Sequence, residues 1–406
     1  MSHTYAIGDT IEVRIEKIVP RGFGLAFAQE LTVFVPLSAP GDHLRVRIVE
    51  IKKRTAFAEI VDVIKAGEQR IAPPCKYFGT CGGCDFQQLN YAAQLDAKVG
   101  IIRDCLHRIA KIEYDAEIFI IPSSQQFGYR SRARWHIDRD KKAIGYFARD
   151  SHVVIDIASC PILTPELNSA FENLRQATEW EMLWDGQAEI EAAVGEDGKV
   201  SVFSTEMIEP VTELSFTANG DQYAYSAETF FQSNKFLISE LIDTAVAGAS
   251  GEMAFDLYCG VGLFALPLAK QFATVVAVEE DSSAVGFAKK NVANAGLGNV
   301  KVVAKDVGHF LSQNKTTKID FILIDPPRAG TKKEVITAIA ALRPAQISYV
   351  SCEPSILARD LRILIDAGYN IEKVTALDMF PQTHHVETVV RLHLPELPPT
   401  LASGVR

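Results

Sequence analysis

The sequence predicts an α/β protein in three parts: a small N-terminal β-barrel, a central α+β domain and a C-terminal doubly wound sheet. Two patterns indicate this division. Short segments of alternating hydrophobicity occupy the N-terminus, and strand-like and helix-like segments alternate from about residue 230. A length of 406 residues accommodates two or three domains of about 100–200 residues each. We expect these domains to span residues 1–65, 66–229 and 230–406.

Composition and the N-terminal residues indicate a folded protein of the cytoplasm. Hydrophobic residues make up 48% and charged residues 23%, which excludes a disordered or collagen-like chain. The opening sequence MSHTYAIGDTIEV lacks the apolar core of a secretory signal. The charge-free run 257–269 has 13 residues, fewer than the roughly 20 that cross a bilayer. We expect no membrane partner, and the absence of heptads or a long apolar stripe predicts a monomer.

The net charge of −10 argues weakly against a nucleic-acid partner, but the charges are unevenly distributed. Residues 179–228 contain 12 acids and one base, so the remainder of the chain is close to neutral. Residues 129–149 contain seven bases and two acids. The averaged charge therefore conceals a candidate phosphate-binding face.

The N-terminal part alternates apolar and charged residues over short runs. Ile11, Val13 and Ile15 alternate with charged residues, as do residues 44–48, and Pro-Gly segments at 20–22 and 40–42 break the runs. Period two over short runs predicts a small barrel. Its arginines would bind RNA as in oligonucleotide-binding folds, or they form an ordinary solvated face.

A predicted helix follows at about 91–112, because five apolar residues are spaced by three and four positions between Leu95 and Ile109. We expect this helix to pack on the C-terminal domain, with Cys105 in the core. The chain has seven cysteines and no predicted secretion signal, so disulfides are improbable. Cys75, Cys81, Cys84 and Cys160 have the spacing of a metal centre, either zinc or an iron–sulfur cluster. Four cysteines leave no open iron position, so a structural role is expected; unrelated buried thiols are the alternative.

The C-terminal part has strand-like segments at 253–257, 274–278, 300–303, 319–324 and 347–350, with helical stretches between them. This alternation predicts a parallel sheet, and the strand-like segments 371–377 and 388–392 predict an antiparallel edge. Gly260 and Gly262 follow the first strand, and Glu279 ends the next. Such a loop and acid fit NAD and S-adenosylmethionine equally well.

Asp325-Pro326-Pro327-Arg328 distinguishes the two cofactors, because methyltransferases commonly place such a loop beside the methyl donor. Arg328 stands where amino-group methylases have an aromatic residue, which counts against methylation of an exocyclic amine. Cys352 ends the following strand, where a thiol before a helix can act as a nucleophile; a small buried residue is the alternative. Glu387 directly precedes the strand-like segment 388–392, and adjacent strands would carry both residues to one pocket.

Together these motifs resemble the RNA uracil-carbon-5 methyltransferase family, which forms 5-methyluridine in 23S rRNA and tRNA. The resemblance is to the branch with an N-terminal TRAM (OB-like) barrel and a [4Fe–4S] cluster, and it covers nearly the whole chain. Six motifs occur in the family's order. They are the four-cysteine spacing, Phe230-Phe231-Gln232, Asp256–Gly262, Asp325-Pro-Pro-Arg, Ser-Cys-x-Pro and His385-Val-Glu-Thr388.

The resemblance implies a class I S-adenosylmethionine-dependent methyltransferase domain and a role for each site residue. The four cysteines would hold the cluster, Cys352 would be the nucleophile and Glu387 the base. The implied donor-binding residues are Gln232, Tyr258, Gly260, Gly262, Glu279, Asp325 and, with a weaker argument, Asp306. Glu353 departs from the family's usual Asn after the nucleophile, and it places a negative charge beside the thiol.

The expected partner is structured RNA, with 23S rRNA the first candidate and the T-loop of tRNA the second. Arg130, Arg132 and Arg134 would share one strand face and contact phosphates; a surface ion-pair ladder is the alternative. The acidic window 179–228 should face away from the RNA. Two other functions remain open on the sequence: a different methyltransferase, and a non-enzymatic RNA-binding iron–sulfur protein.

Overall fold

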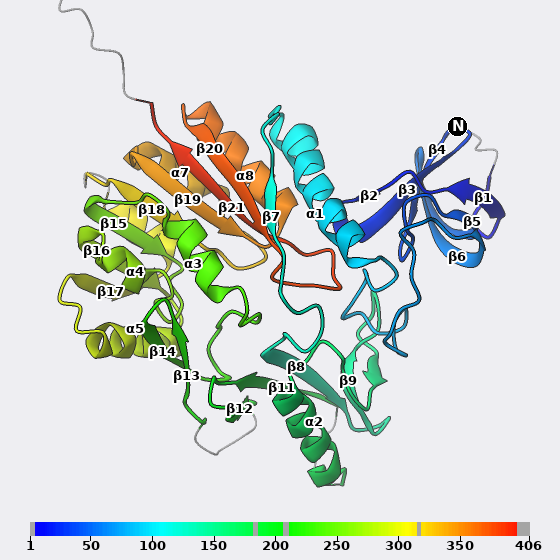
Figure 1. Ribbon diagram of the computed structural model, residues 1–406, viewed down its shortest axis with the longest axis horizontal. Helices are drawn as coiled ribbons and strands as arrows, with labels where there is room; N and C mark the ends of the chain where they lie inside the picture. Colours follow the sequence, from blue (N-terminus) through cyan, green and yellow to red (C-terminus); the bar gives the residue numbers. More distant parts are fainter. Residues whose placement is uncertain (1–4, 182–185, 206–210, 315–317, 396–406) are drawn as a thin grey trace, which may run out of the picture. The chain divides into compact units, whose positions relative to one another are not determined.

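The computed structural model describes residues 5–181, 186–205, 211–314 and 318–395, and these form two compact units (Figure 1). The first unit comprises Met1–Leu241 together with Cys352–Ser355 and Ala376–Glu387. The second comprises Ile242–Ser351, Ile356–Thr375 and Thr388–Arg406. The barrel and the central part thus belong to one unit, and two short segments from the end of the chain belong with them.

Six strands of the first unit form the predicted N-terminal barrel. They are β1 (Thr10–Arg14), β2 (Lys17–Val19), β3 (Phe23–Ala28), β4 (Leu31–Val35), β5 (His43–Lys52) and β6 (Thr55–Lys65). Their order is β1-β5-β6-β4-β3-β2, and only β4 and β6 are parallel. The inward residues of the alternating runs, among them Val13, Val46 and Ala56, are buried in one core. The outward Arg45 and Arg47 are each 3.3 Å from a glutamate, Glu12 and Glu59 respectively, as on a solvated face.

The predicted helix after the cysteines is α1 (Tyr91–Cys105), which continues as a π-helical turn over Leu106–Ala110. The Asn90 side chain caps it by accepting a hydrogen bond from the Ala93 N–H. Within the first unit α1 contacts β2 and β7 (Phe119–Ile121). Cys105 is buried, as expected, and packing of this helix on the C-terminal domain stays a prediction.

A five-stranded antiparallel sheet with order β10-β9-β8-β11-β12 forms the rest of the central part. Its strands are β8 (Arg132–Asp138), β9 (Ala143–Phe147), β10 (Val154–Asp156), β11 (Gln187–Val194) and β12 (Val200–Phe203). Helix α2 (Pro165–Ala177) packs on it, with the Phe171 ring 4.9 Å from that of Trp135. A separate hairpin pairs β13 (Leu214–Ala218) with β14 (Asp221–Tyr225).

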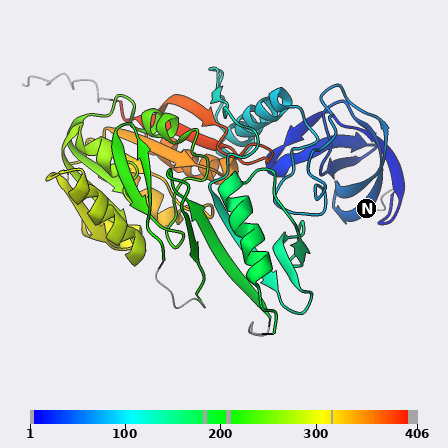
Figure 2. The same cartoon turned by 60° about the horizontal axis from the view of Figure 1, so that its bottom comes forward.

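The second unit contains the predicted doubly wound sheet. Five parallel strands have the order β17-β16-β15-β18-β19, followed by the antiparallel β21 and then by β20. The strands are β15 (Gly251–Leu257), β16 (Phe272–Glu279), β17 (Val300–Ala304), β18 (Phe321–Ile324), β19 (Gln346–Ser351), β20 (Asn370–Leu377) and β21 (Glu387–His393). The helices are α3 (Ile238–Val246), α4 (Ala265–Ala269), α5 (Ser282–Asn294), α6 (Val307–Gln313), α7 (Lys333–Leu342) and α8 (Pro354–Asp366). Figure 2 shows α5, in yellow-green, which packs along β16 and β17.

The parallel sheet and its antiparallel edge are confirmed, with strand ends within two residues of the predicted ones. In the part of the chain that the structure describes, no helix combines the length and apolarity needed to cross a bilayer.

Candidate active site

Cys352 and Glu387 lie at the same end of two neighbouring strands. β19 ends at Ser351, which pairs with Thr388 of the antiparallel β21. Cys352 directly follows Ser351, and Glu387 directly precedes Thr388, so both residues stand next to the last pair of this register. Glu387 is buried and Cys352 half-buried. The two side chains that the sequence singled out therefore lie at neighbouring strand ends.

Glu353, which directly follows Cys352, accepts hydrogen bonds from a residue further along the chain. Its Oε1 accepts hydrogen bonds from the Ser355 N–H (3.3 Å) and hydroxyl (2.7 Å). Both donors lie in the first turn of α8, so the carboxylate satisfies groups that a helix leaves unpaired at its N-terminus. The departure from the family pattern thus has a local structural role at the start of α8.

Three other predicted residues emerge at the carboxyl edge of the parallel sheet in the second unit. The last residue of β15 pairs with the last of β18 and with the second-to-last of β16. Tyr258, Glu279 and Asp325 therefore come together at this edge, where doubly wound sheets bind ligands. Asp306, two residues past β17, caps α6 by accepting a hydrogen bond from the His309 N–H (2.8 Å).

The glycine loop bends back toward Glu279. Tyr258, Gly260 and Gly262 have φ of 64°, 53° and 91°, so three residues of this short loop are left-handed. Glu279 accepts a hydrogen bond from the Gly260 N–H (3.0 Å) and two more from the N–H groups of the residues that follow it. A Cβ built on Gly260 would meet no described atom within 4 Å, so there is space beside the loop.

Three carboxyl groups, those of Asp256, Glu279 and Asp325, are near enough at this edge for their charges to interact. Asp256 is fully buried, and among the described residues neither of its carboxylate oxygens has a hydrogen-bond partner. Burial, and then the charges of Asp325 and Glu279, raise the pKa of Asp256 well above its usual range, although the nearby Ala265 N–H opposes this shift. Burial also raises the pKa of Asp325 to about 7. Such an environment favours a cationic ligand and disfavours a pyrophosphate.

Gln232 belongs to the first unit and is buried. The preceding Phe231 stacks on Tyr225, with ring centroids 4.2 Å apart. The following Ser233 accepts hydrogen bonds at its carbonyl from the N–H (2.7 Å) and hydroxyl (3.0 Å) of Ser131. The segment that carries Gln232 is therefore held on both sides.

The four predicted ligand cysteines are electrostatic neighbours. Burial raises the pKa of Cys84, and the charge of Cys160 raises it further. Burial raises the pKa of Cys160 to about 11. The N–H groups of Ile162 and Leu163 oppose this shift, and the charge of Cys81 adds to it. Cys81 in turn has its pKa raised by burial and by Cys75, while the Gly83 N–H donates to its sulfur (3.4 Å). Among the described residues, no three Cys, His, Asp or Glu side chains are arranged to hold a single metal ion.

The three predicted RNA-binding arginines are engaged in contacts within the first unit. Arg130 donates to the Arg132 carbonyl (3.0 Å), and Arg132 donates to two carbonyls of the segment 226–227. Arg134 is exposed and donates to Glu191 (2.6 Å). Because β11 pairs with β8, Glu191 is directly opposite Arg134. These contacts resemble the ion-pair ladder that was the alternative.

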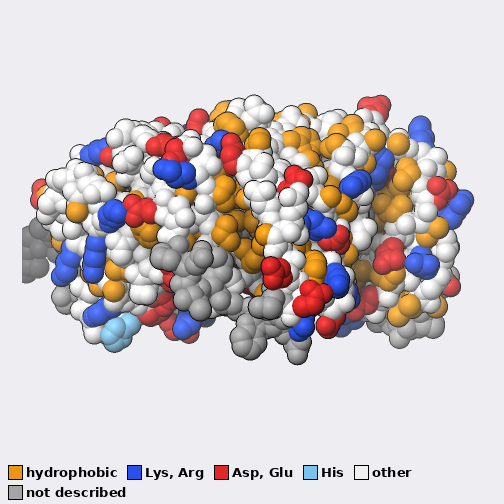
Figure 3. Space-filling model, turned by 90° about the horizontal axis from the view of Figure 1, so that it is seen from below, with side chains coloured by type: hydrophobic (Ala, Val, Ile, Leu, Met, Phe, Trp, Pro, Cys, Tyr) orange, Lys and Arg blue, Asp and Glu red, His pale blue; other side chains and the backbone are white. Residues whose placement is uncertain are grey.

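Two glutamates of the acidic window, Glu189 and Glu191, lie on the strand next to these arginines. That the window faces away from the RNA stays a prediction. Asp185, Glu206 and Glu209 lie outside the described residues. Figure 3 shows basic and acidic side chains intermingled on the face seen from below.

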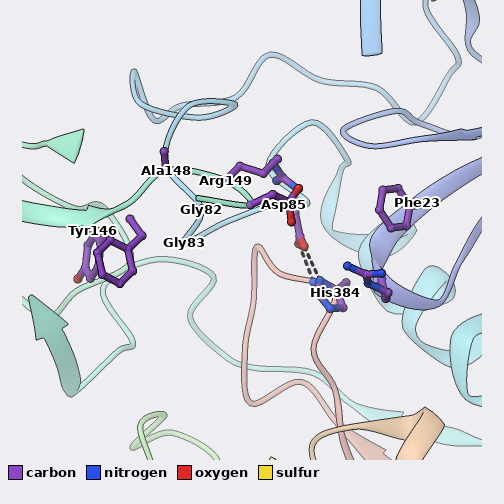
Figure 4. A pocket seen from close by; sticks show the side chains of 11 residues that line it. Phe23, Gly82, Gly83, Asp85, Tyr146, Ala148, Arg149 and His384 are labelled. Atoms are coloured by element: carbon purple, nitrogen blue, oxygen red, sulfur yellow. Dashed lines mark hydrogen bonds and ion pairs between the residues drawn. The ribbon is translucent and has the colours of Figure 1, made fainter. Parts of the chain in front are cut away.

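A cavity of about 360 Å³ in the first unit was not anticipated from the sequence. Its lining includes Arg21 and Phe23 of the barrel, Tyr146 and Arg149 near the end of β9, and His384 (Figure 4). The Arg21 guanidinium lies 5.5 Å from the centre of the Phe23 ring. Cations and aromatic rings in one hollow are suited to nucleic acid, because phosphates pair with arginine and bases stack on rings. The lining comes from separate segments, so no local motif marks it.

Comparisons with known proteins agree with this arrangement. A family model described as tRNA (Uracil-5-)-methyltransferase matches residues 187–394. A model of the tRNA (uracil(54)-C(5))-methyltransferase TRAM domain matches residues 11–68. A protein of Thermosynechococcus vestitus described as an uncharacterized RNA methyltransferase is 32% identical, over 95% of this chain and 98% of its own.

Two further relatives have specified substrates. The 23S rRNA (uracil(1939)-C(5))-methyltransferase RlmD of Shewanella amazonensis is 32% identical, with 96% of each chain covered. The crystal structure of Pyrococcus abyssi tRNA (uracil-54, C5)-methyltransferase, in complex with S-adenosyl-L-homocysteine, is similar with a TM-score of 0.73 and 26% identity. The match covers 94% of this chain and 100% of that one.

A parallel sheet of this order, with a glycine loop and acidic side chains at its carboxyl edge, is that of the class I S-adenosylmethionine-dependent methyltransferases. The chain belongs to the tRNA (uracil-5-)-methyltransferase family, and its barrel is a TRAM domain. It is thus an RNA uracil-5-methyltransferase, which excludes the non-enzymatic alternative.

Proposed function

We propose that the protein methylates carbon 5 of one uridine in structured RNA through a covalent adduct with Cys352, and that Glu387 is the base. The observation that supports this proposal is the pairing of Ser351 with Thr388, because Cys352 directly follows Ser351 and Glu387 directly precedes Thr388. A nucleophile and a base at neighbouring strand ends can reach the same pyrimidine ring.

We favour 23S rRNA as the substrate over the T-loop of tRNA. The support is the RlmD relative, which is 32% identical over 96% of this chain, against 26% for the Pyrococcus tRNA enzyme. Mapping of 5-methyluridine in both RNAs from a strain that lacks the gene tests this choice. Loss in tRNA alone would identify the second candidate.

In the proposed mechanism the Cys352 thiolate forms a bond to carbon 6 of the uracil, and the electron pair of the ring double bond moves onto carbon 5 as an enolate. Bound S-adenosylmethionine would supply the methyl group that carbon 5 then takes, and its sulfur–methyl bond would break to leave S-adenosylhomocysteine. Glu387 removes the proton from carbon 5, the ring double bond re-forms, and the bond between carbon 6 and sulfur breaks. The RNA leaves as 5-methyluridine, and Cys352 is again a thiolate.

The residues of the second unit fit the methyl donor. Its sulfonium and ammonium groups are cations, and the ionised form of Asp325, whose pKa burial raises to about 7, would attract them at the sheet edge. Glu279 would accept hydrogen bonds from the ribose hydroxyls, and the left-handed Gly260 leaves space for a ligand beside the loop. On the first unit, Gln232 is the further residue proposed to bind the donor.

We propose that the four cysteines would hold a [4Fe–4S] cluster, and zinc is the alternative. Zinc would draw four sulfurs to about 2.3 Å from one point. A cluster binds each thiolate through a different iron, so its sulfurs stand further apart. Cys84→Ser should lower the bound iron and sulfide and the visible absorbance. Unchanged iron and sulfide contents would remove this cysteine from the ligand set.

We propose that RNA binds the first unit through the cavity lined by Arg21, Phe23 and Arg149, with Arg130, Arg132 and Arg134 as further candidates. A uracil within a helix hides carbon 6, so the nucleotide must leave the stack at a cost of a few kcal/mol. Phosphate and stacking contacts outside the reacting base supply that energy.

Two variants test the covalent mechanism. Cys352→Ala should bind RNA and transfer no methyl group, because the bond to carbon 6 cannot form. Glu387→Gln should accumulate a protein–RNA adduct, visible as a slow band on a denaturing gel, because only the last proton removal is blocked. Mass spectrometry of digested RNA checks that the product is 5-methyluridine. Normal turnover of Glu387→Gln without that band would remove this residue from the mechanism.

A further inference from the structure

The loop between β20 and β21, residues 378–386, leads directly into Glu387 and contains an unusual backbone conformation. Gln382 has φ of 71° and is buried. Left-handed backbone is costly for a residue with a side chain. It persists only where the surroundings fix it, and such positions cluster at functional sites.

Four hydrogen bonds from other segments of the first unit hold Gln382. The Gln94 side chain of α1 accepts from the Gln382 N–H (2.9 Å) and donates to its side-chain oxygen (3.1 Å). The N–H groups of Asp85 and Phe86 donate to its carbonyl (3.1 and 3.0 Å). Gln94 is itself buried, so both of its bonds form away from competing water.

Further side chains of the first unit anchor the rest of the loop. The Asp85 carboxylate accepts from the His384 N–H (2.7 Å) and also pairs with its ring, as Figure 4 shows. Lys98 donates hydrogen bonds to the Asp378 carboxylate and to the Phe380 carbonyl. The Tyr91 hydroxyl donates to Asp378, and the Tyr129 hydroxyl donates to the Pro381 carbonyl. Contacts from α1 and from the cysteine loop thus converge on a segment that is otherwise irregular.

We propose that Gln94 and Asp85 are positioning residues: they fix the turn at Gln382 and thereby set the place of Glu387 relative to Cys352. The inference rests on the proposed function, in which Glu387 removes the proton from carbon 5. Asp85 follows Cys84 directly, so the loop that carries the cysteines also holds the loop that carries the base.

The lifetime of the RNA adduct separates positioning from general stability. Attack by Cys352 and methyl transfer do not need Glu387, whereas release does. In Gln94→Ala, decay of the adduct should slow about tenfold, part of the roughly 100- to 10,000-fold that a positioned base contributes. Gln382→Gly relieves the left-handed backbone and so should fold, yet it too should lengthen the adduct's life, because it frees the turn. The readouts are gel-band decay after quenching and the melting temperature of each variant.

Gln88→Ala is the matched control. Gln88 is also a buried glutamine and lies shortly before α1, but its side chain donates to the Ser38 carbonyl in the barrel (3.0 Å). It should lose stability without changing the adduct's lifetime. The inference would be overturned if the adduct decayed at the wild-type rate in both Gln94→Ala and Gln382→Gly. It would also be overturned if Gln88→Ala slowed adduct decay as much as Gln94→Ala does. Should Gln94→Ala fail to fold, Gln382→Gly decides. A Glu387→Gln enzyme with no adduct would instead refute the proposed role of Glu387.

Discussion

Replacement of Lys98 by methionine should destabilise the first unit strongly. The Lys98 ammonium and the Asp378 carboxylate have no exposed side-chain surface, and they pair directly. Lys98 also donates to the Phe380 carbonyl (2.9 Å), and the Tyr91 hydroxyl donates to Asp378 (2.8 Å). Methionine preserves the unbranched stem of the lysine but removes its charge. Asp378 would then be a buried carboxylate with only Tyr91 as a strong side-chain partner.

The expected magnitude follows from this burial. Removal of one partner of a buried pair costs about 3–5 kcal/mol, because the other charge remains without compensation. For a unit of this size the melting temperature should fall by roughly 6–20 °C. Denaturant unfolding followed by circular dichroism and calorimetric melting both measure the effect. The double variant Lys98→Met with Asp378→Leu should recover most of the loss, since no buried charge remains.

An exposed pair provides the comparison. Lys17 lies 2.9 Å from Asp104, but 46% of its side chain is exposed. Lys17→Met should therefore cost less than about 1 kcal/mol. The reasoning fails if Lys98→Met costs no more than Lys17→Met, because the burial of the pair would then have no energetic consequence.

Two further predictions concern ligands. If the arginine strand β8 forms an ion-pair ladder, Arg134→Ala will leave the salt dependence of RNA binding unchanged, whereas a phosphate contact would reduce the slope of log K against log salt by about one. Filter binding across a salt series measures this, with Arg21→Ala of the cavity as the variant expected to reduce the slope. Because burial raises the pKa of Asp325 to about 7, this carboxyl gains charge between pH 6 and pH 8, and its charge favours a cationic donor. The ionised fraction, and with it the affinity for S-adenosylmethionine, should therefore fall about fivefold from pH 7 to pH 6. In calorimetric titrations Asp325→Asn should bind more weakly and without this pH dependence, and a pH-dependent Asp325→Asn would exclude this carboxyl as the source.

The local hydrophobic pattern sufficed to predict both sheets. Inward residues such as Val13 and Val46 are buried in the barrel, and the strands of the second unit have the expected ends. These elements are predictable because burial of one face imposes period two on half-buried strands, and burial of both faces produces short apolar runs between helices. The glycine loop could also be predicted from the sequence, because the left-handed backbone at Gly260 and Gly262 favours glycine at these positions.

The contacts that could not be predicted from the sequence depend on which distant segments pair with each other. Arg134 shows why: its outward position on a strand is predictable, but its partner Glu191 is known only once β11 is placed beside β8. Period two reports which residues share a face and says nothing of the neighbouring strand. The same holds for Gln94, which a helical pattern alone would assign to a polar face, but which is buried against Gln382.

The loop before Glu387 departs from ordinary folding rules in two independent ways. Lys98 and Asp378 are charged side chains with no exposed surface, and Gln382 is a non-glycine residue with a left-handed backbone conformation. Local rules of this kind are broken chiefly where function requires a fixed geometry, and the cost is met by stability elsewhere. A surface loop that merely joined β20 to β21 would need neither feature, since two antiparallel strands are connected well by short solvated turns. Asp378 and Gln382 both lie within nine residues of Glu387. Both departures therefore agree with the proposal that this loop fixes the position of Glu387.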